Sequence, residues 1–261
     1  MTLKVLKKLK VDAVSLPNNH TMDFGSEVML ETKRLLEENN IHTYGAGINQ
    51  GEAEKPYKFT LVGEKSSKNV YIFTGMKAEE RYHTELNFMA TNNSPGVNNL
   101  DNKRMIKQIN YYRTIDPESV IIINPHWQGI DYQWANEFSD IRVMCREFID
   151  AGADMVIGHG THMLSTIEEY KGKRIVYSIG NFVFTSPGRY KKLGVPPCSL
   201  ITKVQIEEND GKWLIKDEHI PIFTDNRRSK FKPYIINNDE LQTYLNKNKN
   251  NNKDMQKKLY L

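Results

Sequence analysis

The sequence predicts a single α/β domain built on mixed β-sheets. Segments with a helical spacing of apolar residues alternate with short apolar segments through most of the chain, and the second half changes to the alternation of antiparallel strands. No internal repeat, low-complexity linker or change of composition divides the 261 residues, which are enough to bury a sizeable core. We therefore expect one domain over residues 1–240, followed by a polar Asn- and Lys-rich C-terminal tail over residues 241–261.

The composition is that of an ordinary soluble globular protein, with 39% hydrophobic and 26% charged residues. Much of the mild net charge of +4 lies in the tail, which favours a solvated terminus over a patch for an anionic partner. We expect no nucleic-acid partner. No stretch approaches the roughly 18 apolar residues of a membrane span, and residues 1–10 lack the apolar region of a signal peptide. The chain is therefore expected to be soluble as written, with Cys145 and Cys198 free.

The first part of the chain predicts the beginning of a βαβ unit, with Ser26 as the cap of its helix. Residues 81–99 have no clear period and many Asn residues, and we expect them to form a long surface loop. The elements predicted before this loop are helix 3–9, strand 12–16, helix 26–39, strand 41–44 and a hairpin of strands 59–62 and 70–73.

After the loop, helices and wholly apolar strands alternate, which is typical of strands buried in a parallel sheet. From Thr166 onward the pattern predicts two hairpins, which turn at Lys171-Gly172 and at Asn209-Asp210-Gly211. The elements predicted between the loop and these hairpins are helix 101–112, strand 119–124, helix 137–151 and strand 155–157.

Three of the predicted strands end in a turn that carries histidine: VSLPNNH, VIIINPH and MVIGHGTH. In open α/β sheets, ligands gather at the carboxyl ends of strands, because the loops there project into a shared crevice. We therefore expect the three turns to meet in space and to bring together their polar residues, which are Asn19, His20, His126, His159 and His162.

His159 and His162 lie three residues apart in a glycine-rich turn, so both imidazoles could reach one ion or two adjacent ions. The alternative is that each histidine forms a local hydrogen bond at the end of a strand. His126 is followed by Trp127, for which core packing is favoured over substrate stacking, and by Asp131, which could orient an imidazole.

Asn19 adds a carbonyl oxygen, which is a hard metal ligand, beside the imidazole of His20, which can donate a proton near neutral pH. Asp23 could accept a hydrogen bond from His20 and hold its orientation. The alternative is a simple loop at the entry to a helix, because Asn and Asp are common turn formers, but a loop gives no reason for His20. The remaining histidines, expected to lack convergent partners, are His42, His83 and His219.

The segments NNHTMDFG, PHWQGIDY and GADMVIGHGTHMLSTIEEYKGKRIVYSIGNFVF, in this order, resemble the bacterial capsule-synthesis family, the CapA or poly-γ-glutamate biosynthesis proteins. That family belongs to the calcineurin-like metallophosphatase superfamily. The resemblance runs from about Val11 to Thr185, and its last segment is the most specific. It implies a four-layer sandwich in which two mixed β-sheets are flanked by helices, with a metal centre at the loop ends.

The resemblance also implies roles for single residues. Asn19 would be a bridging metal ligand, and His20 would act toward the leaving group. The other metal ligands implied are His126, His159 and His162. The chain departs from the family pattern at Gly160 and Thr161, where relatives carry an imidazole and a proline, and at Gln128, which stands before the glycine of the histidine-tryptophan motif.

A larger departure lies at the front of the chain. The family normally opens with a strand that ends in Gly-Asp, and superfamily enzymes take carboxylate ligands from this strand and the next. No such motif precedes Asn19, so either the chain is truncated and lacks the first strand, or it works with a reduced site. Histidine and amide ligands carry less negative charge than carboxylates, so we expect one divalent transition metal ion (Mn, Zn or Fe) rather than two.

Three functions remain open at this point. The Asn-His pair favours a capsule-biosynthesis protein that is a metal-dependent hydrolase of a phosphoester, with His20 as the acid and Asp23 steering it. The missing first-strand ligands favour a non-catalytic binding or assembly factor for an anionic capsule polymer, with a degenerate metal site. An incomplete domain without activity is the third. Expected partners are an anionic polymer or a phosphoester substrate, and other capsule-synthesis proteins at the membrane. Relatives often carry an amino-terminal membrane anchor. If the native protein has an anchor that the given sequence lacks, we expect it to be associated with the membrane at the cell surface.

Overall fold

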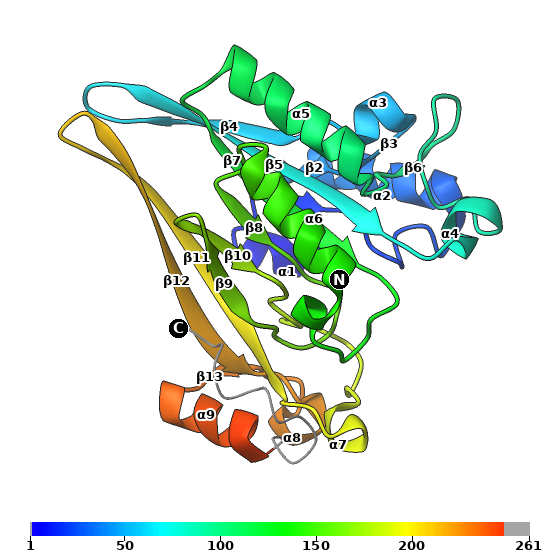
Figure 1. Cartoon of the computed structure of the whole chain (residues 1–261). Helices are drawn as coiled ribbons and strands as arrows, with labels where there is room; N and C mark the ends of the chain where they lie inside the picture. The colour runs from blue at the N-terminus through cyan, green and yellow to red at the C-terminus, as the bar shows by residue number, and fades with distance from the viewer. Residues whose placement is uncertain (1, 248–261) are drawn as a thin grey trace. The chain divides into compact units, whose positions relative to one another are not determined.

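The computed structural model describes residues 2–247, which fold into two compact units (Figure 1). Unit 1 contains the chain up to Thr60 together with Asn69–Gly129, and unit 2 contains Leu61–Lys68 and the chain from Ile130 onward. Both units combine helices with strands, so the predicted α/β class is confirmed. The extent of a single domain over residues 1–240 stays a prediction.

In unit 1, the predicted βαβ beginning is confirmed, because β1 and β2 pair in parallel across helix α2. Strand β5 pairs in parallel with β7 and neighbours β4, whereas β3 and β6 are antiparallel. The elements that lie wholly or mainly in unit 1 are α1 (Thr2–Lys8), β1 (Ala13–Ser15), α2 (Gly25–Glu37), β2 (His42–Tyr44), β3 (Ala46–Gly47), α3 (Gln50–Ala53), β4 (Tyr57–Val62), β5 (Ser67–Lys77), α4 (Arg81–Thr84), β6 (Gly96–Val97), α5 (Asn102–Ile115) and β7 (Val120–Trp127).

Two helix starts in unit 1 show how local sequence sets the element bounds. Helix α5 begins after Asp101, whose side chain accepts a hydrogen bond from the backbone N–H of Arg104, as an N-cap should. Helix α2 begins after Phe24 without a side-chain cap. The predicted cap at Ser26 was therefore wrong, since this residue lies inside the first turn.

The prediction that residues 81–99 form a long loop on the surface was wrong about their burial. The segment contains only the short elements α4 and β6, but most of its apolar side chains, though not that of Leu86, are buried in the core of unit 1. The buried side chains, which share one cluster with Met76, are Tyr82, Phe88, Met89 and Val97. Because they are spaced irregularly and pack against strands that are distant in sequence, no helical or strand period marks them.

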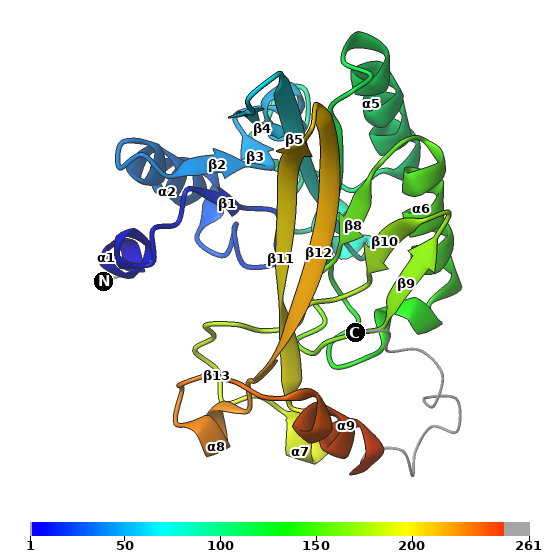
Figure 2. The same cartoon turned by 90° about the vertical axis from the view of Figure 1, so that its left-hand side faces the viewer.

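Unit 2 is also mixed, because β10 pairs in parallel with β8 and antiparallel with β9. A long antiparallel hairpin of β11 and β12 carries β13 at its edge (Figure 2). The elements of unit 2 are a 3₁₀ turn (Ala135–Glu137), α6 (Ser139–Asp150), β8 (Met155–Ile157), β9 (Ile167–Tyr170), β10 (Lys173–Val176), α7 (Tyr190–Leu193), β11 (Cys198–Asn209), β12 (Lys212–Phe223), α8 (Asn226–Ser229), β13 (Tyr234–Ile235) and α9 (Asn238–Lys247).

Both hairpin turns predicted in the second half are confirmed. Lys171 and Gly172 have φ angles of 51° and 72°, and Asp210 and Gly211 have φ angles of 50° and 79°. Positive φ at both central residues is the geometry of the two-residue turn that matches the twist of paired strands. Cys145 and Cys198 are free and buried, as expected.

Part of the predicted polar tail is helical. Residues 241–247 belong to α9, which buries Leu241 and Leu245 in the core of unit 2. Asn237 and Glu240 cap this helix reciprocally, since the backbone N–H of each donates to the side chain of the other, both at 2.9 Å. The remaining residues of the predicted tail lie outside the described part of the chain. Within residues 2–247, no helix combines the length and the apolar character needed to cross a membrane.

The expectation that His219 lacks partners was wrong. This residue lies in β12 directly opposite Thr202 of β11. Its Nε2 is 2.7 Å from Oδ2 of Asp217, and its Nδ1 is 3.2 Å from Oγ1 of Thr202. Arg174 also donates to Oδ2 of Asp217, at 3.1 Å. Burial lowers the pKa of His219, although the hydrogen bond with Asp217 opposes this shift.

This lowered pKa predicts that unit 2 loses stability in mild acid. Above the pKa of an unfolded histidine, near 6.5, the imidazole is neutral in both states, and its full contribution is present. As the pH falls below that value, the unfolded chain binds a proton that the folded chain resists, so the free energy of unfolding decreases. Urea unfolding of wild type and His219→Gln between neutral pH and mild acid measures this effect. A slope that is equal in the two proteins would contradict it.

Candidate active site

The loop after β1 is held by short-range hydrogen bonds of Asn18. Its Nδ2 donates to the carbonyl of Leu16 at 3.1 Å, and its Oδ1 accepts from the backbone N–H of His20 at 2.9 Å. The adjacent Pro17 packs against Gly45, where φ is +83° and an added Cβ would lie 2.3 Å from Cγ of Pro17. The turn-forming role predicted for asparagine here is thus filled by Asn18, which leaves Asn19 available for other contacts.

His20 and Asp23 form a pair at the exposed edge of this loop. Nδ1 of His20 is 2.8 Å from Oδ2 of Asp23, and the two side chains are 68% and 43% exposed. An exposed polar pair of this kind contributes little to folding stability. Its effect is to fix the ring, which presents Nε2 3.4 Å from Nδ2 of Asn19. The orienting contact expected of Asp23 is therefore present.

Asn19 also contacts His126, which is separated from it by more than a hundred residues in sequence. Oδ1 of Asn19 lies 3.2 Å from Nε2 of His126. The predicted strand ended at residue 124, which would place His126 after it. Strand β7 instead continues to Trp127, so His126 lies within the strand. His126 is only 7% exposed and Trp127 only 1%, which confirms the core-packing interpretation of the tryptophan.

The spacing of these two atoms fits metal ligation. Ligands about 2.1 Å from one ion, at angles between 90° and tetrahedral, are about 3.0–3.4 Å apart. The amide oxygen and imidazole nitrogen of Asn19 and His126 meet this condition. They are also the oxygen and nitrogen donors that Mn, Zn and Fe accept.

Polar contacts hold the ends of the supporting strands together. Oγ of Ser15 in β1 is 2.8 Å from Oγ1 of Thr74 in β5. The hydroxyl of Thr74 donates to the carbonyl of Asn124 in β7 at 2.7 Å. Gln128, which departs from the family pattern, accepts a hydrogen bond from the backbone N–H of Glu79 at 3.1 Å. In unit 1, therefore, two of the three histidine-bearing turns meet, although β1 and β7 belong to different sheets.

The third turn, after β8, lies in unit 2. His162 adopts a φ of +66° and Gly160 a φ of +111°, so the turn curls tightly. Nδ1 of His162 is 3.1 Å from Oδ1 of Asn181, and Nε2 is 3.8 Å from Oδ1 of Asp131. The ring also stacks on Tyr132, with 5.2 Å between the centroids. Asp131 thus approaches the imidazole of His162.

The contact of Asn181 with His162 was not predicted from the sequence. Nδ2 of Asn181 donates to the hydroxyl of Tyr190 at 3.1 Å, and this hydroxyl donates to the carbonyl of His162 at 2.8 Å. Asn181 and Tyr190 therefore hold both the ring and the backbone of His162. The one available signal was the SIGNF segment that contains Asn181.

His159 differs from His162 in its environment. Burial lowers its pKa to about 4, so the imidazole is neutral at physiological pH. The neutral form is the one that binds metal ions.

The structure brings Asn19, His20, Asp23 and His126 together in unit 1, and it places His159 and His162 in unit 2. Among the residues from 2 to 247, no three His, Cys, Asp or Glu side chains form a cluster with the arrangement of a metal site. The expectation that all three turns share one metal stays a prediction.

Comparisons with known proteins identify related chains. Over 184 residues, the chain is 32% identical to the PGA biosynthesis protein CapA of Bacillus subtilis (strain 168), covering 70% of this chain and 45% of the relative. It is 29% identical over 191 residues to the capsule biosynthesis protein CapA of Bacillus anthracis, covering 70% and 42%. The structure is similar to that of NAD nucleotidase from Haemophilus influenzae, with a TM-score of 0.49, 13% identity, and coverage of 94% of this chain and 47% of that protein.

The chain thus spans less than half the length of these curated relatives. The family model described as "Bacterial capsule synthesis protein PGA_cap" matches residues 1–186, which contain all three histidine-bearing turns. The chain therefore belongs to the bacterial capsule synthesis protein family, PGA_cap.

Proposed function

We propose that this chain acts in the synthesis of an anionic capsule polymer, as a metal-dependent hydrolase of a phosphoester or related ester. The names of its relatives, which refer to capsule and PGA biosynthesis, support the first part. The observation that carries the second part is the arrangement in unit 1, where His20 is paired with Asp23 next to Asn19, and Asn19 contacts His126.

Asn19 and His126 would hold a single divalent ion of Mn, Zn or Fe, and the sequence also predicts His159 and His162 as metal ligands. When bound, such an ion supplies Lewis-acid chemistry, which offsets negative charge on the reacting oxygens. Histidine and amide ligands carry less negative charge than carboxylates, so one ion is proposed.

His20 would donate a proton to the departing oxygen. Its ring is exposed, so a substrate can reach it, and Asp23 fixes Nδ1 so that Nε2 is the atom presented to the substrate. Proton donation by a positioned side chain contributes about 10²–10⁴-fold to a rate. Asp23 acts only by orienting the imidazole.

Metal content tests the ligand proposal. We expect purified wild type to retain a divalent transition metal, and Asn19→Ala, His126→Ala, His159→Ala and His162→Ala to retain less. His83→Ala, which removes a histidine of α4 outside the predicted ligand set, is the matched control. Elemental analysis of the six proteins decides the question. Equal and negligible metal in all of them would contradict the proposal.

Turnover tests the hydrolase proposal separately. A panel of phosphomonoesters and phosphodiesters with added Mn or Zn should include a substrate that wild type cleaves. If metal is bound but no substrate is cleaved, the hydrolase assignment is wrong. The alternative is then a non-catalytic binding or assembly role for an anionic capsule polymer, which is favoured by a cavity in unit 2 whose lining includes Lys191, Arg227 and Arg228.

A further inference from the structure

A large cavity lies in unit 2, and its lining includes residues of α7, α8 and α9. These three helices gather at one end of the β11–β12 hairpin (Figures 1 and 2). The volume of the cavity is about 1040 Å³. All of its lining residues lie between Gly188 and Lys247, which is beyond the residues 1–186 matched by the family model. The lining therefore includes none of the residues proposed as metal ligands or as the proton donor, although Tyr190, which lines the cavity, also donates to the carbonyl of His162.

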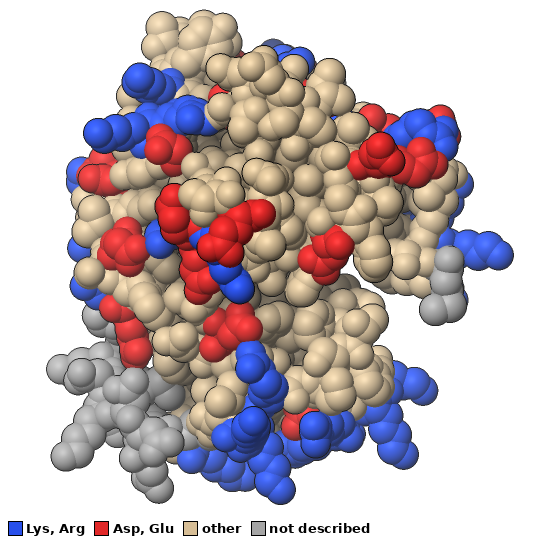
Figure 3. All heavy atoms as spheres, turned by 90° about the vertical axis from the view of Figure 1, so that its right-hand side faces the viewer, with Lys and Arg blue, Asp and Glu red and all other residues tan. Residues whose placement is uncertain are grey.

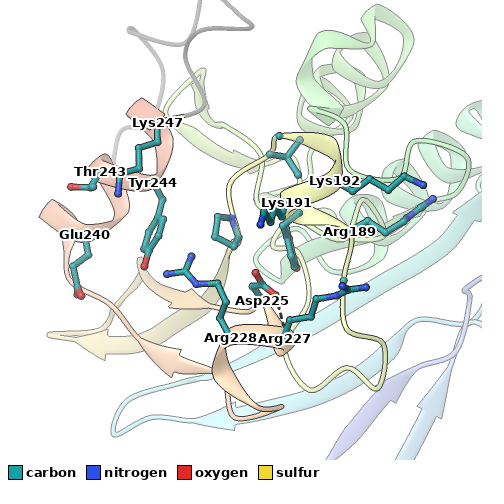
Figure 4. Close-up of a pocket in the computed structure, with 15 residues that line it drawn as sticks. Arg189, Lys191, Lys192, Asp225, Arg227, Arg228, Glu240, Thr243, Tyr244 and Lys247 are labelled. Carbon is teal, nitrogen blue, oxygen red and sulfur yellow. Dashed lines mark hydrogen bonds between the residues drawn. The ribbon is translucent and has the colours of Figure 1, made fainter.

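Cationic side chains dominate the lining of this cavity. The lining contains six cationic residues and only two acidic ones, Asp225 and Glu240. Figure 3 shows Lys and Arg gathered along the lower part of one face of the molecule. The six cationic residues, labelled in Figure 4, are Arg189, Lys191, Lys192, Arg227, Arg228 and Lys247. Like charges that line a hollow focus a positive potential within it.

Most of this charge is not neutralised within the described chain. Arg189 is paired with Asp131 at 2.8 Å. Within residues 2–247, no carboxylate lies at ion-pairing distance from the other five cationic residues. Asp225 is only 6% exposed, and its Oδ1 accepts from the backbone N–H of Arg227 at 3.1 Å, so this carboxylate serves as the cap of α8.

The walls of the cavity are held by a shared core. Tyr190 of α7, Phe223 of β12 and Leu241 of α9 belong to one buried cluster. The guanidinium of Arg228 lies over the rings of Phe223 and Tyr244, at 4.8 Å and 5.7 Å from their centroids. Stacking of this kind fixes an arginine while its N–H groups remain able to donate. The cations are thus attached to a packed framework, which lowers the cost of ordering them around a ligand.

We propose that this cavity binds an extended polyanion, a chain that carries repeated carboxylate or phosphate groups. Cations on three separate helices suit several anionic groups at once better than a single small anion, and arginine matches planar carboxylate or tetrahedral phosphate through paired hydrogen bonds. Tyr244, Val195 and Pro197 add apolar surface for the segments between the anionic groups. The inference deepens the proposed function, since an anionic capsule polymer is such a chain, but it does not depend on hydrolysis.

Binding is measured with a fluorescent glutamate oligomer and with inorganic polyphosphate, in the presence of a chelator, at low and at physiological ionic strength. The two probes distinguish carboxylate from phosphate chains. We expect wild type to bind at least one of them, and the double variant Lys191→Gln/Arg227→Gln to bind roughly tenfold or more weakly. The matched control is Lys203→Gln/Lys212→Gln, which removes the same charge from the β11–β12 hairpin outside the cavity and should leave binding unchanged.

Equal weakening in both double variants would overturn the proposal, because it would show nonspecific attraction by net charge. Acetate or inorganic phosphate binding as tightly as the polymers would also overturn it, as would pocket-dependent binding to anionic lipid vesicles without binding to either polymer. Because the chelator removes divalent metal, failure of this test leaves the hydrolase proposal standing, and failure of the turnover panel leaves this inference standing.

Discussion

Replacement of His20 by glutamine is expected to lower kcat for phosphoester hydrolysis by about 10²–10⁴-fold while leaving metal content unchanged. Glutamine keeps a polar side chain of similar reach but cannot supply a proton near neutral pH. The side chain of His20 is 68% exposed, so the substitution should not disturb folding. The measurement is kcat together with elemental analysis of the same preparation.

The leaving group provides the control for this prediction. An ester whose leaving group is a stable anion needs little protonation, so His20→Gln should slow it far less than an alkyl ester. Asp23→Asn keeps a hydrogen-bonding contact with His20 but removes the charge, and we expect a smaller loss than with His20→Gln, because the proton donor itself remains. Full activity of His20→Gln on alkyl esters, or an equal loss on both esters, would contradict the role of general acid.

Much of the fold could be predicted from the sequence where local rules decide the structure. The predicted strand 155–157 has the bounds that the structure gives to β8, because it is wholly apolar and ends at a glycine. The hairpin turns at Lys171-Gly172 and Asp210-Gly211 follow from residues that tolerate positive φ. The start of α9 could have been predicted, because Asn237 and Glu240 have the spacing of a helix cap and Leu241 and Leu245 follow four residues apart. The prediction of a polar tail did not use this pattern.

Long-range contacts mark the limit of such prediction. The contact of His219 with Thr202 could have been predicted from the sequence, because the turn at Asp210-Gly211 sets a strand register that places these two residues directly opposite each other. The prediction that Asn19 and His126 lie close together rested on the general tendency of ligands to bind at strand ends, and the structure shows this contact. No spacing rule connects Asn181 to His162, because their contact depends on how two separate loops pack.

Replacement of Gly180 by alanine is expected to destabilise unit 2 by about 2–4 kcal/mol, from about 1 kcal/mol of backbone strain and about 1–3 kcal/mol of crowding. Gly180 has a φ of +76°, which L-residues rarely adopt. An added Cβ would lie 2.4 Å from Oγ of Ser199 and 2.8 Å from the backbone carbonyl carbon of Met163. Ser199 is fully buried, so its hydroxyl has little room to move.

Gly172→Ala separates strain from crowding. Gly172 has a similar φ of +72°, but an added Cβ would meet no atom within 4 Å. Alanine there should therefore cost only the strain, about 1 kcal/mol. Urea unfolding of wild type and both variants gives the two free energies. Equal losses would show that crowding at Gly180 is relieved at no cost. A larger loss at Gly180 would mean that the backbone of Met163, next to His162, cannot yield, so that glycine before Asn181 is a requirement of the loop that holds this imidazole.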